Sequence, residues 1–476
     1  MNQPHEWTRS EKVHAGADVL AVGFATSVAM WAVGYVLRMP AVVVPPWLLA
    51  GGLGATLLAG GFYAGYATRR GAMGGLYAGL VTATLNLLIV SGALRNAQGQ
   101  GPSALTWIPG TLIVTAIIMT IMAAIGSIVR RRHPKITSQT PNWTGRFALV
   151  AVVATGLLLI AGGLVTGHEA GLAVPDWPNS YGYNMILYPF ARMTGNIYYE
   201  HAHRLYGVLV GLTTIVLAIH LWMVDDRKWI KMLMIGAIAA VVAQGLMGAA
   251  RVLAAHSDGG VEVATAANEN TLSIALRIAH GIFGQLFLAL MTAIAVFCST
   301  TWRQTTERTP HAAATSDHTL TALLLAGFVI QLLLGAIVRH TGAGVFWHIS
   351  MASILFLGTL VIGMRLWGLY GDDHVVLKRI GGALVGFISL QLGLGIAALV
   401  VITLSNQAGK PSAADAILTT AHQATGATLL ALGTVAMLLT RRLLQPKTAS
   451  ARSPQQARSK SSESLSLQGR STESQT

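Results

Sequence analysis

Four histidines lie inside apolar stretches of the sequence that are long enough to cross a membrane. His203, His280, His348 and His422 each fall in the first third of such a stretch. An ionisable residue inside a membrane span is rare and usually functional. Neutral imidazole offers one lone pair to a metal, and heme iron takes two axial ligands from opposite faces of the porphyrin. The set therefore indicates two bis-histidine hemes, whereas the alternative for each histidine alone is an interhelical hydrogen bond.

A carboxylate accompanies the first of these histidines. In Glu-His-Ala-His-Arg at 200–204, Glu200 precedes His203 by three residues, which places both on one face of a helix. A carboxylate beside a metal site is a candidate proton donor, proton acceptor or stabiliser of positive charge. The other interpretation is an i, i+4 ion pair with Arg204. Arg204 is itself predicted to contact the bound heme.

Three arginines near the ends of the same spans are candidates for binding the carboxylate groups of a heme. Arg251, Arg277 and Arg339 lie on the side of the membrane nearer to the four histidines. A guanidinium group can form a bidentate ion pair with a heme propionate. Ordinary anchoring at the membrane interface is the alternative for each arginine.

The remaining histidines are expected to have no ligand role. Those expected to be solvated or interfacial are His220, at the far end of its helix, and His133, His311, His318 and His374, in predicted loops. Those expected to be exposed on the side of the four intramembrane histidines are His168, His201, His256 and His340.

The elements that position these residues are membrane helices. A helix needs about 20 apolar residues to cross a hydrocarbon core of about 30 Å, and a lipid-exposed backbone must satisfy its own hydrogen bonds. The chain is therefore predicted to be an all-α polytopic membrane protein with about twelve transmembrane helices. The predicted spans lie near 17–37, 45–66, 72–95, 107–129, 145–166, 200–223, 230–253, 273–298, 318–338, 346–368, 378–402 and 416–440.

Composition and charge agree with a bilayer. Only 11% of the 476 residues are charged, against roughly a quarter in soluble chains. The net charge of +14 does not indicate nucleic-acid binding, because the Lys and Arg residues are clustered in alternate loops. By the positive-inside rule these loops, and both termini, are cytoplasmic. The clusters are Arg9 with Lys12, Arg69–Arg70, Arg130–Arg132, Arg227–Lys228, Arg303 with Arg308, Lys378–Arg379 and Arg441–Arg442.

The last eight predicted spans resemble two copies of one four-helix unit. The stretch 277–295 aligns with 419–437, which superposes His280 on His422, and a second alignment superposes His203 on His348. Glu200 and Arg204 then fall on Val345 and Ile349, so we expect one site to carry chemistry and the other to transfer electrons. A Gln-x-x-x-Gly pair also recurs, at Gln244 and Gly248, Gln331 and Gly335, and Gln391 and Gly395, which is typical of close helix packing.

These observations divide the chain into five predicted regions. A cytoplasmic segment at 1–16 precedes an additional four-helix membrane module at 17–135, to which the sequence assigns no role. The first four-helix repeat follows at 145–300 and the second at 318–442. The tail at 445–476 is rich in Ser, Gln, Arg and Lys and is predicted to be disordered.

Over about residues 145–440 the chain resembles the heme A synthase family, membrane enzymes that convert heme O to heme A for terminal oxidases. The resemblance rests on the four-histidine repeat and on ordered short motifs. These are Gly162-Gly163-Leu164-Val165, Glu169-Ala170-Gly171-Leu172, Pro175-Asp176-Trp177-Pro178, Glu200-x-x-His203-Arg204, and Gln244-Gly245-Leu246-Met247-Gly248 with Arg251.

The resemblance implies roles for the site residues. It makes His203 and His280 the ligands of the substrate heme O, with Glu200 as the essential carboxylate. It makes His348 and His422 the ligands of a resident heme b that passes electrons. The implied reaction oxidises a ring methyl group to a formyl group through successive hydroxylations.

Partners and location follow as expectations. We expect contact with membrane lipid, with heme O and its synthase, and with an electron donor that the sequence does not identify; a homo-oligomer is possible. A bacterial cytoplasmic membrane is favoured over a mitochondrial one, because no Arg-rich transit segment precedes the first span.

Two other functions use parts of the same pattern. A diheme cytochrome b that carries electrons without catalysis needs the four histidines but does not need Glu200. A transporter is suggested by internal repeats in a twelve-span chain, although inverted repeats need an odd number of helices per unit and this unit has four.

Overall fold

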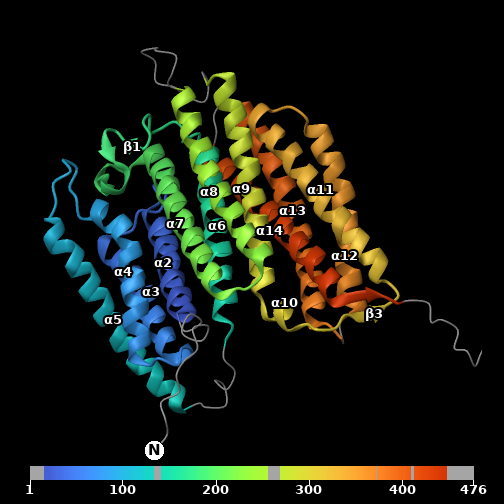
Figure 1. The fold of residues 1–476 in the computed structure, drawn as a ribbon. Helices are drawn as coiled ribbons and strands as arrows, with labels where there is room; N and C mark the ends of the chain where they lie inside the picture. The colour runs from blue at the N-terminus through green and yellow to red at the C-terminus, as the bar shows by residue number, and fades with distance from the viewer. Residues whose placement is uncertain (1–15, 133–140, 256–268, 371–372, 409–411, 448–476) are drawn as a thin grey trace, which may run out of the picture.

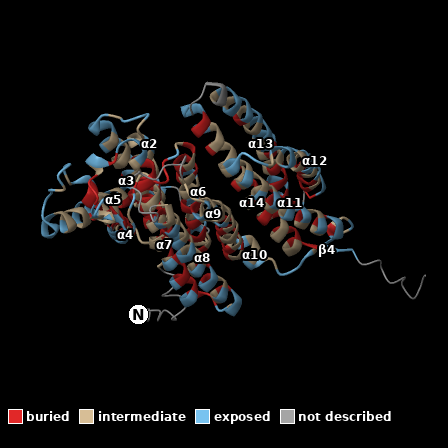
Figure 2. Ribbon diagram, turned by 90° about the horizontal axis from the view of Figure 1, so that it is seen from above, coloured by how far each residue is buried: buried red, intermediate tan, exposed pale blue. Residues whose placement is uncertain are grey.

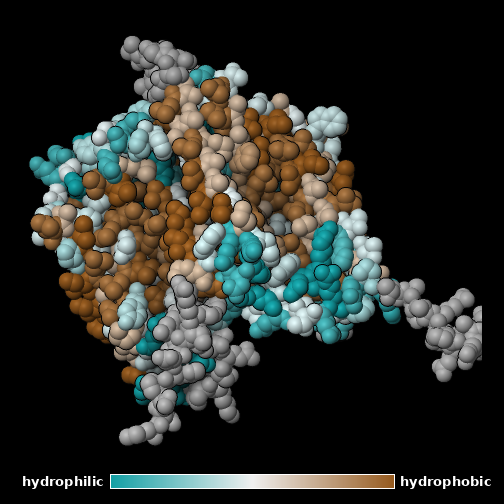
Figure 3. Space-filling view, viewed as in Figure 1, coloured by the Kyte–Doolittle hydropathy of each residue, from teal (hydrophilic) through white to brown (hydrophobic). Residues whose placement is uncertain are grey.

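The described residues form twelve long apolar helices, as the sequence predicts. The computed structural model describes residues 16–132, 141–255, 269–370, 373–408 and 412–447. The helices fall into three groups that follow one another along the chain and stand side by side across the membrane (Figure 1). The space-filling view shows a broad apolar face over these helices, with hydrophilic residues gathered toward its edges (Figure 3).

The first group is the additional N-terminal module. Its helices are joined by very close backbone contacts: a Cβ added to Gly65 would lie only 1.8 Å from the Ala123 carbonyl oxygen, so only glycine permits this approach of α3 to α5. Glycines therefore take the place of large side chains in holding this module together. Its helices are α2 (Ala17–Arg38), α3 (Pro46–Ala67), α4 (Ala72–Ala93) and α5 (Ala104–Arg132).

The second group contains the first pair of candidate heme ligands. A connection with short elements precedes its second helix and includes the two-stranded antiparallel pair β1 (Asn179–Ser180) and β2 (Tyr183–Asn184). We call the side of the membrane on which this connection lies the β1–β2 side. The helices are α6 (Trp143–Gly167), α7 (Gly195–Val224), α8 (Lys228–Ala255) and α9 (Thr271–Cys298), with η2 (Met185–Leu187) and η3 (Phe190–Arg192) before α7.

The third group contains the second pair of candidate ligands. On the side opposite β1–β2, the short α10 (Thr300–Gln304) and strand β3 (Thr309–His311) lead into it, and β3 pairs in parallel with β4 (Leu444–Pro446). Gln445 and Pro446 are thus part of a strand, which corrects the predicted start of the disordered tail; residues 448–476 lie outside the described residues. The helices are α11 (Ala314–Thr341), α12 (Val345–Leu369), α13 (Val375–Ala408) and α14 (Ala413–Leu443).

The second and third groups meet along α6 and α14. A Cβ on Gly163 would lie 2.8 Å from Thr420 Cγ2, and one on Gly167 would lie 2.8 Å from the Ala416 Cα. Small residues on both helices thus bring the two groups into direct contact. Seen from above, the buried residues gather between the helices, whereas α12 and α13 turn exposed faces outward at the edge of the third group (Figure 2).

Candidate functional site

The first two intramembrane histidines face each other. His203 on α7 and His280 on α9 have ring centroids 6.3 Å apart and ring planes at 82°. A metal between the two rings would form one bond of about 2 Å to a nitrogen of each ring. These two bonds, together with the distance from each bonded nitrogen to the centroid of its own ring, add up to a separation of this size. The Nδ1 atoms of both histidines are buried and have no hydrogen-bond partner among the described residues. The pair therefore fits a group that accepts two nitrogen ligands from opposite sides.

The second two histidines form an equivalent pair. His348 on α12 and His422 on α14 also have ring centroids 6.3 Å apart, with planes at 66°. Here glutamine side chains contact the rings: Gln331 Nε2 lies 3.1 Å from His348 Nδ1, and Gln391 Nε2 lies 3.2 Å from His422 Nε2. An amide N–H that donates to a ring nitrogen uses the lone pair that a metal would otherwise bind, so a metal at this pair would replace these contacts.

A glycine on the preceding helix lies against each of the four histidines. The distances below are those from a Cβ added at the glycine to the histidine Cε1. The pairs are Gly162 and His203 at 2.9 Å, Gly248 and His280 at 3.5 Å, Gly335 and His348 at 3.1 Å, and Gly395 and His422 at 3.0 Å. Three of these glycines belong to the Gln-x-x-x-Gly motif, which the sequence indicated only as helix packing. Gly162 was missed, because its helix has Leu158 where the others have glutamine.

This donor set suits heme better than a metal held by the protein alone. Within the described part of the chain, His, Cys, Asp and Glu form no group of three or more that could hold a metal ion. A porphyrin supplies four nitrogens itself and asks the protein for two axial ligands. The two facing histidine pairs provide these ligands.

Glu200 lies buried at the β1–β2 end of α7, with 4% of its surface exposed. One carboxylate oxygen accepts a hydrogen bond from Arg204 Nη2 at 2.7 Å, and the other accepts one from the Val174 backbone N–H at 2.8 Å. The i, i+4 ion pair considered from the sequence is therefore present. This pairing keeps the carboxylate within one helical turn of His203.

The guanidinium of Arg204 is also occupied by the connection that precedes α7. It donates to the backbone oxygens of Val174 at 2.8 Å, Asp176 at 2.7 Å and Asn179 at 3.1 Å. Glu200 and Arg204 thus fasten this connection to the helix that carries His203. The predicted contact of Arg204 with a heme has no test in the structure and stays a prediction.

Arg251 and Arg277 come together around one carboxylate that the sequence reading overlooked. Glu269 accepts from Arg251 Nε at 3.1 Å and pairs with Arg277 Nη1 at 2.8 Å. Burial alone would raise the pKa of Glu269, but the Ser273 hydroxyl and the two arginines hold this pKa below its usual value. Glu269 is therefore ionised at neutral pH, and the two guanidinium groups form a ready site for carboxylates.

Arg339 extends this positive cluster from the third group of helices. Its electrostatic neighbours include Arg277 on α9. The adjacent His340, expected to be exposed, is half-buried and contacts α9: a Cβ on Gly281 would lie 4.0 Å from His340 Nε2. The predicted propionate ligands Arg251, Arg277 and Arg339 thus lie close to the junction of the two groups.

Two histidines expected to be exposed or solvated are buried. His201 is 0% exposed, lies 3.0 Å from Ser180 Oγ through Nδ1, and contacts the Tyr188 ring at 4.7 Å between centroids. His220 is 5% exposed and lies 3.0 Å from Thr144 Oγ1. His318, placed in a loop by the sequence reading, lies in the second turn of α11 and contacts the Thr440 carbonyl oxygen. These errors arise because burial at helix ends depends on neighbours distant in sequence.

The N-terminal module contacts α7 and the connection before it. The ring of Trp31 lies 5.6 Å from that of Tyr206, and the ring of Tyr35 lies 5.4 Å from that of Tyr198. Arg38 Nη2 donates to the Phe190 carbonyl at 3.1 Å. The module therefore supports the helix that carries Glu200 and His203 on the face away from α14.

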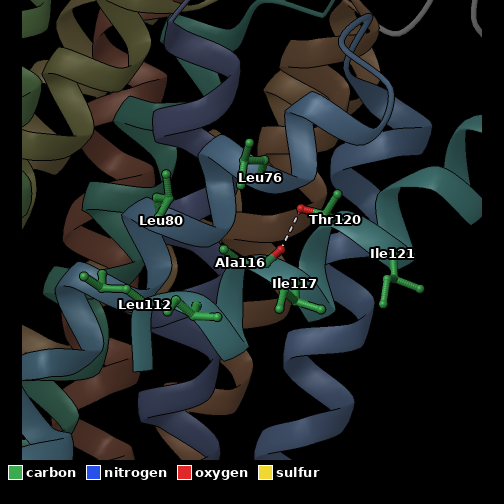
Figure 4. Close-up of a pocket in the computed structure, with 8 residues that line it drawn as sticks. Leu76, Leu80, Leu112, Ala116, Ile117, Thr120 and Ile121 are labelled. Carbon is green, nitrogen blue, oxygen red and sulfur yellow. Dashed lines mark hydrogen bonds between the residues drawn. The ribbon is translucent and has the colours of Figure 1, made fainter. Parts of the chain in front are cut away.

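An apolar pocket of about 480 Å³ lies on the N-terminal module, between α4 and α5 (Figure 4). Thr120 is the one lining residue with a polar side chain, and its hydroxyl donates a hydrogen bond to the Ala116 carbonyl at 2.6 Å. The lining residues offer no charged group to fix a polar ligand. They are Leu76, Leu80, Leu112, Ile113, Ala116, Ile117, Thr120 and Ile121. The pocket is therefore not the candidate site.

The part of the chain that carries the first histidine pair is similar to known proteins. The family model described as cytochrome oxidase assembly protein (COX15-CtaA) matches residues 145–348. A curated protein from Lysinibacillus sphaericus (strain C3-41), named heme A synthase, is 33% identical over 114 residues. That match covers 24% of this chain and 36% of the relative, so it spans about a third of the relative's length.

Proposed function

We propose that the chain is a heme A synthase that oxidises heme O to heme A, a proposal supported by the match of residues 145–348 to the cytochrome oxidase assembly family and by the similarity to a curated heme A synthase. In this proposal the first histidine pair, His203 and His280, binds heme O as substrate. The second pair, His348 and His422, holds a heme b. The first three of these histidines fall within the matched region, and His422 rests on the geometry of its own pair.

The observation that carries the proposal is the facing pair of half-buried histidines in the matched region, whose Nδ1 atoms are buried. Their rings are 6.3 Å apart and their Nδ1 atoms have no partner in the described chain. Such atoms are costly to bury unless a ligand satisfies them. An iron porphyrin satisfies both at once.

Each side chain then has a specific task. His203 and His280 orient the macrocycle, and Arg251 and Arg277 bind its propionates in exchange for Glu269. Glu200, held by Arg204 and Val174, presents a buried carboxylate one turn from His203 and stabilises positive charge, or accepts a proton, when the ring methyl group is oxidised. Heme b, when bound by His348 and His422, would supply one-electron transfer.

Location and partners complete the proposal. The chain acts in the cytoplasmic membrane of a bacterium with both termini in the cytoplasm, since the Lys and Arg clusters lie opposite the β1–β2 side. It receives heme O from its synthase, and the oxidation of the methyl group to a formyl group consumes an external oxidant such as dioxygen, together with electrons from a separate donor.

The test is the heme content of the full-length chain. The protein is expressed with a supply of heme O, purified in detergent, and examined by reduced pyridine hemochrome spectra and chromatography of extracted hemes. Heme B together with heme O or heme A is the expected result. A preparation that contains no heme under these conditions contradicts the proposal.

A diheme cytochrome b is the second candidate, and one observation favours it. Both oxygens of Glu200 already have partners within the protein, as expected for a carboxylate with a purely structural role. Heme B as the only macrocycle in the preparation would support this electron carrier.

A further inference from the structure

The connection before α7, residues 168–194, lies between α7 and the N-terminal module (Figure 1). Its short helices η2 and η3 contact α4 of the module, and η2 also contacts α7. The family match at residues 145–348 includes the connection but not the module. The module thus reaches the matched region through this connection as well as through α7.

Side chains of the module bond to the main chain of the connection. Ser91 on α4, which is 2% exposed, donates from Oγ to the Ile186 carbonyl at 2.7 Å. Arg38 at the end of α2 donates from Nη2 to the Phe190 carbonyl at 3.1 Å, and its guanidinium lies 5.2 Å from the centre of the Phe190 ring. Because both acceptors are backbone oxygens, these bonds fix the path of the chain through η2 and η3.

The module and the connection also pack with no space for a side chain between them. A Cβ added to Gly92 on α4 would lie 2.5 Å from the Tyr188 carbonyl oxygen. Tyr188 is 2% exposed, and its ring contacts the His201 ring of α7 at 4.7 Å between centroids. Tyr188 of the connection thus contacts both the module and α7.

The connection provides hydrogen-bonding groups to the charged pair on α7. Its Val174 N–H donates to Glu200 at 2.8 Å, and three of its backbone carbonyls accept from Arg204. A buried ion pair is stable only when further hydrogen bonds satisfy its remaining polar atoms. The position of the Glu200 carboxylate therefore depends on where the connection lies and, through Ser91 and Arg38, on the module.

The second half is built differently at the corresponding place. Residues 342–344 alone join α11 to α12, whereas the connection between α6 and α7 contains two strands and two short helices. Val345 and Ile349 hold the positions aligned with Glu200 and Arg204. The third group also stands on the far side of the second group from the module (Figure 1). A change in the module is therefore expected to affect the first site and not the second.

We propose that the N-terminal module is a positioning unit for the first site. Ser91 and Arg38 hold the connection against α7, and the connection holds the carboxylate of Glu200 one helical turn from His203. A connecting segment moves more than the helices it joins, so fixing it narrows the range of positions open to Glu200. This inference rests on the proposed function, because the reaction beside Glu200 is what the module would affect.

The test removes the two bonds from the module to the connection in the full-length protein. The variant Ser91→Ala/Arg38→Met lacks both donors, and methionine keeps an apolar side chain against Phe190. The matched control is Ser127→Ala/Arg130→Met on α5. Both of these control residues also donate to backbone carbonyls, but the acceptors lie within the module itself.

Each variant is examined by three measurements. Hydrogen exchange of the peptide that contains Val174 reports how firmly the connection is held, since the Val174 amide is bonded to Glu200. Turnover of supplied heme O gives kcat and KM separately. Thermal unfolding in detergent reports whether the variant is folded.

In Ser91→Ala/Arg38→Met we expect exchange at this peptide to be roughly tenfold faster, as the loss of two hydrogen bonds predicts. We expect kcat to fall on the order of tenfold, because a catalytic group is displaced, with KM for heme O unchanged. The control should match the wild type in both. Arg38→Lys should also match the wild type, because lysine keeps a donor and a positive charge beside Phe190.

Two results would overturn the proposal. Faster exchange with unchanged kcat would make the module a structural support with no influence on the reaction. A lower kcat without faster exchange would show that the connection does not carry the effect. If the double variant does not fold, Ser91→Ala, which removes one bond only, is compared with Ser127→Ala in the same way.

The failure of this inference is distinguishable from the failure of the proposed function. A wild type that forms no heme A from supplied heme O refutes the proposed function, whatever the exchange rates are. A wild type that forms heme A at the same kcat as a folded Ser91→Ala/Arg38→Met variant refutes the positioning role alone.

Discussion

The two histidine pairs have the same ring separation, yet their surroundings differ in ways that suit different tasks. In the second half, glutamines contact both rings, at 3.1 Å for His348 and 3.2 Å for His422. In the first half, Gln244 reaches only the backbone carbonyl of His280, at 3.3 Å, and the helix opposite His203 has Leu158 at the equivalent position. The rings of the second pair thus contact glutamine side chains, whereas the rings of His203 and His280 have backbone partners, at Leu158 and Gln244.

The two halves also differ in the charged residues next to the first histidine of each pair. A buried ion pair, Glu200 with Arg204, stands one turn from His203, whereas Val345 and Ile349 hold the aligned positions near His348. A buried carboxylate is expensive unless it is paired, so its retention in one half indicates a task that the other half does not have. Under the proposed function, the same ligand geometry would serve chemistry in one half and electron transfer in the other.

The largest expected effect comes from removing one ligand of each pair. His203→Ala should abolish heme A formation and leave about one heme B per chain, because only the second pair is intact. His348→Ala should remove that heme B and leave heme O bound to the first pair. Extraction and chromatography of the hemes measure both results. Loss of the same heme in both variants would show that the pairs do not act as separate sites.

Glu200→Gln tests the difference in charge between the halves. The amide keeps the size of the side chain and can still bond to Val174, but it cannot carry the negative charge. We expect heme A formation to fall on the order of 10²–10⁴-fold, the range for loss of an acid–base group, with both hemes still bound. Turnover per bound heme is the measurement. Unchanged turnover would favour the electron carrier and restrict Glu200 to holding the connection before α7.

The smallest effects should come from the glycines that face the histidines. A methyl group at Gly162 would lie 2.9 Å from His203, whereas one at Gly248 would lie 3.5 Å from His280. Gly162→Ala should therefore displace its histidine and cost about 1–3 kcal/mol, as overpacking does, whereas Gly248→Ala should be nearly neutral. Thermal unfolding followed at the heme absorption band measures both variants. Equal losses would indicate that the glycines serve helix packing in general rather than the histidine rings.

Much of the architecture was predictable, because membrane helices are determined by local composition. A run of apolar residues must become a helix in lipid wherever it occurs, and the twelve predicted spans correspond to the twelve helices. The pairing of His203 with His280 and of His348 with His422 was implied by the resemblance to the heme A synthase family, and the rings of each pair lie 6.3 Å apart in the structure. The division into domains and the assigned roles of the site residues stay predictions.

Other features needed the tertiary structure. His201 and His220 were expected at the surface and are buried, because residues of the β1–β2 connection and of α6 cover them. Glu269 lies between Arg251 and Arg277 because the fold brings the end of α8 close to the start of α9.

The sequence by itself determined the twelve helices of the described residues, their approximate spans and the candidate heme ligands, since each of these depends on residue type and short spacing. The tertiary structure decided which glycine faces which histidine, which carboxylate pairs with which arginine, and which residues of the N-terminal module contact the connection before α7. These are contacts between helices, and helices in lipid associate through local packing and hydrogen bonds rather than through a general hydrophobic force. Such contacts depend on the three-dimensional fit of specific surfaces, which a one-dimensional pattern does not contain.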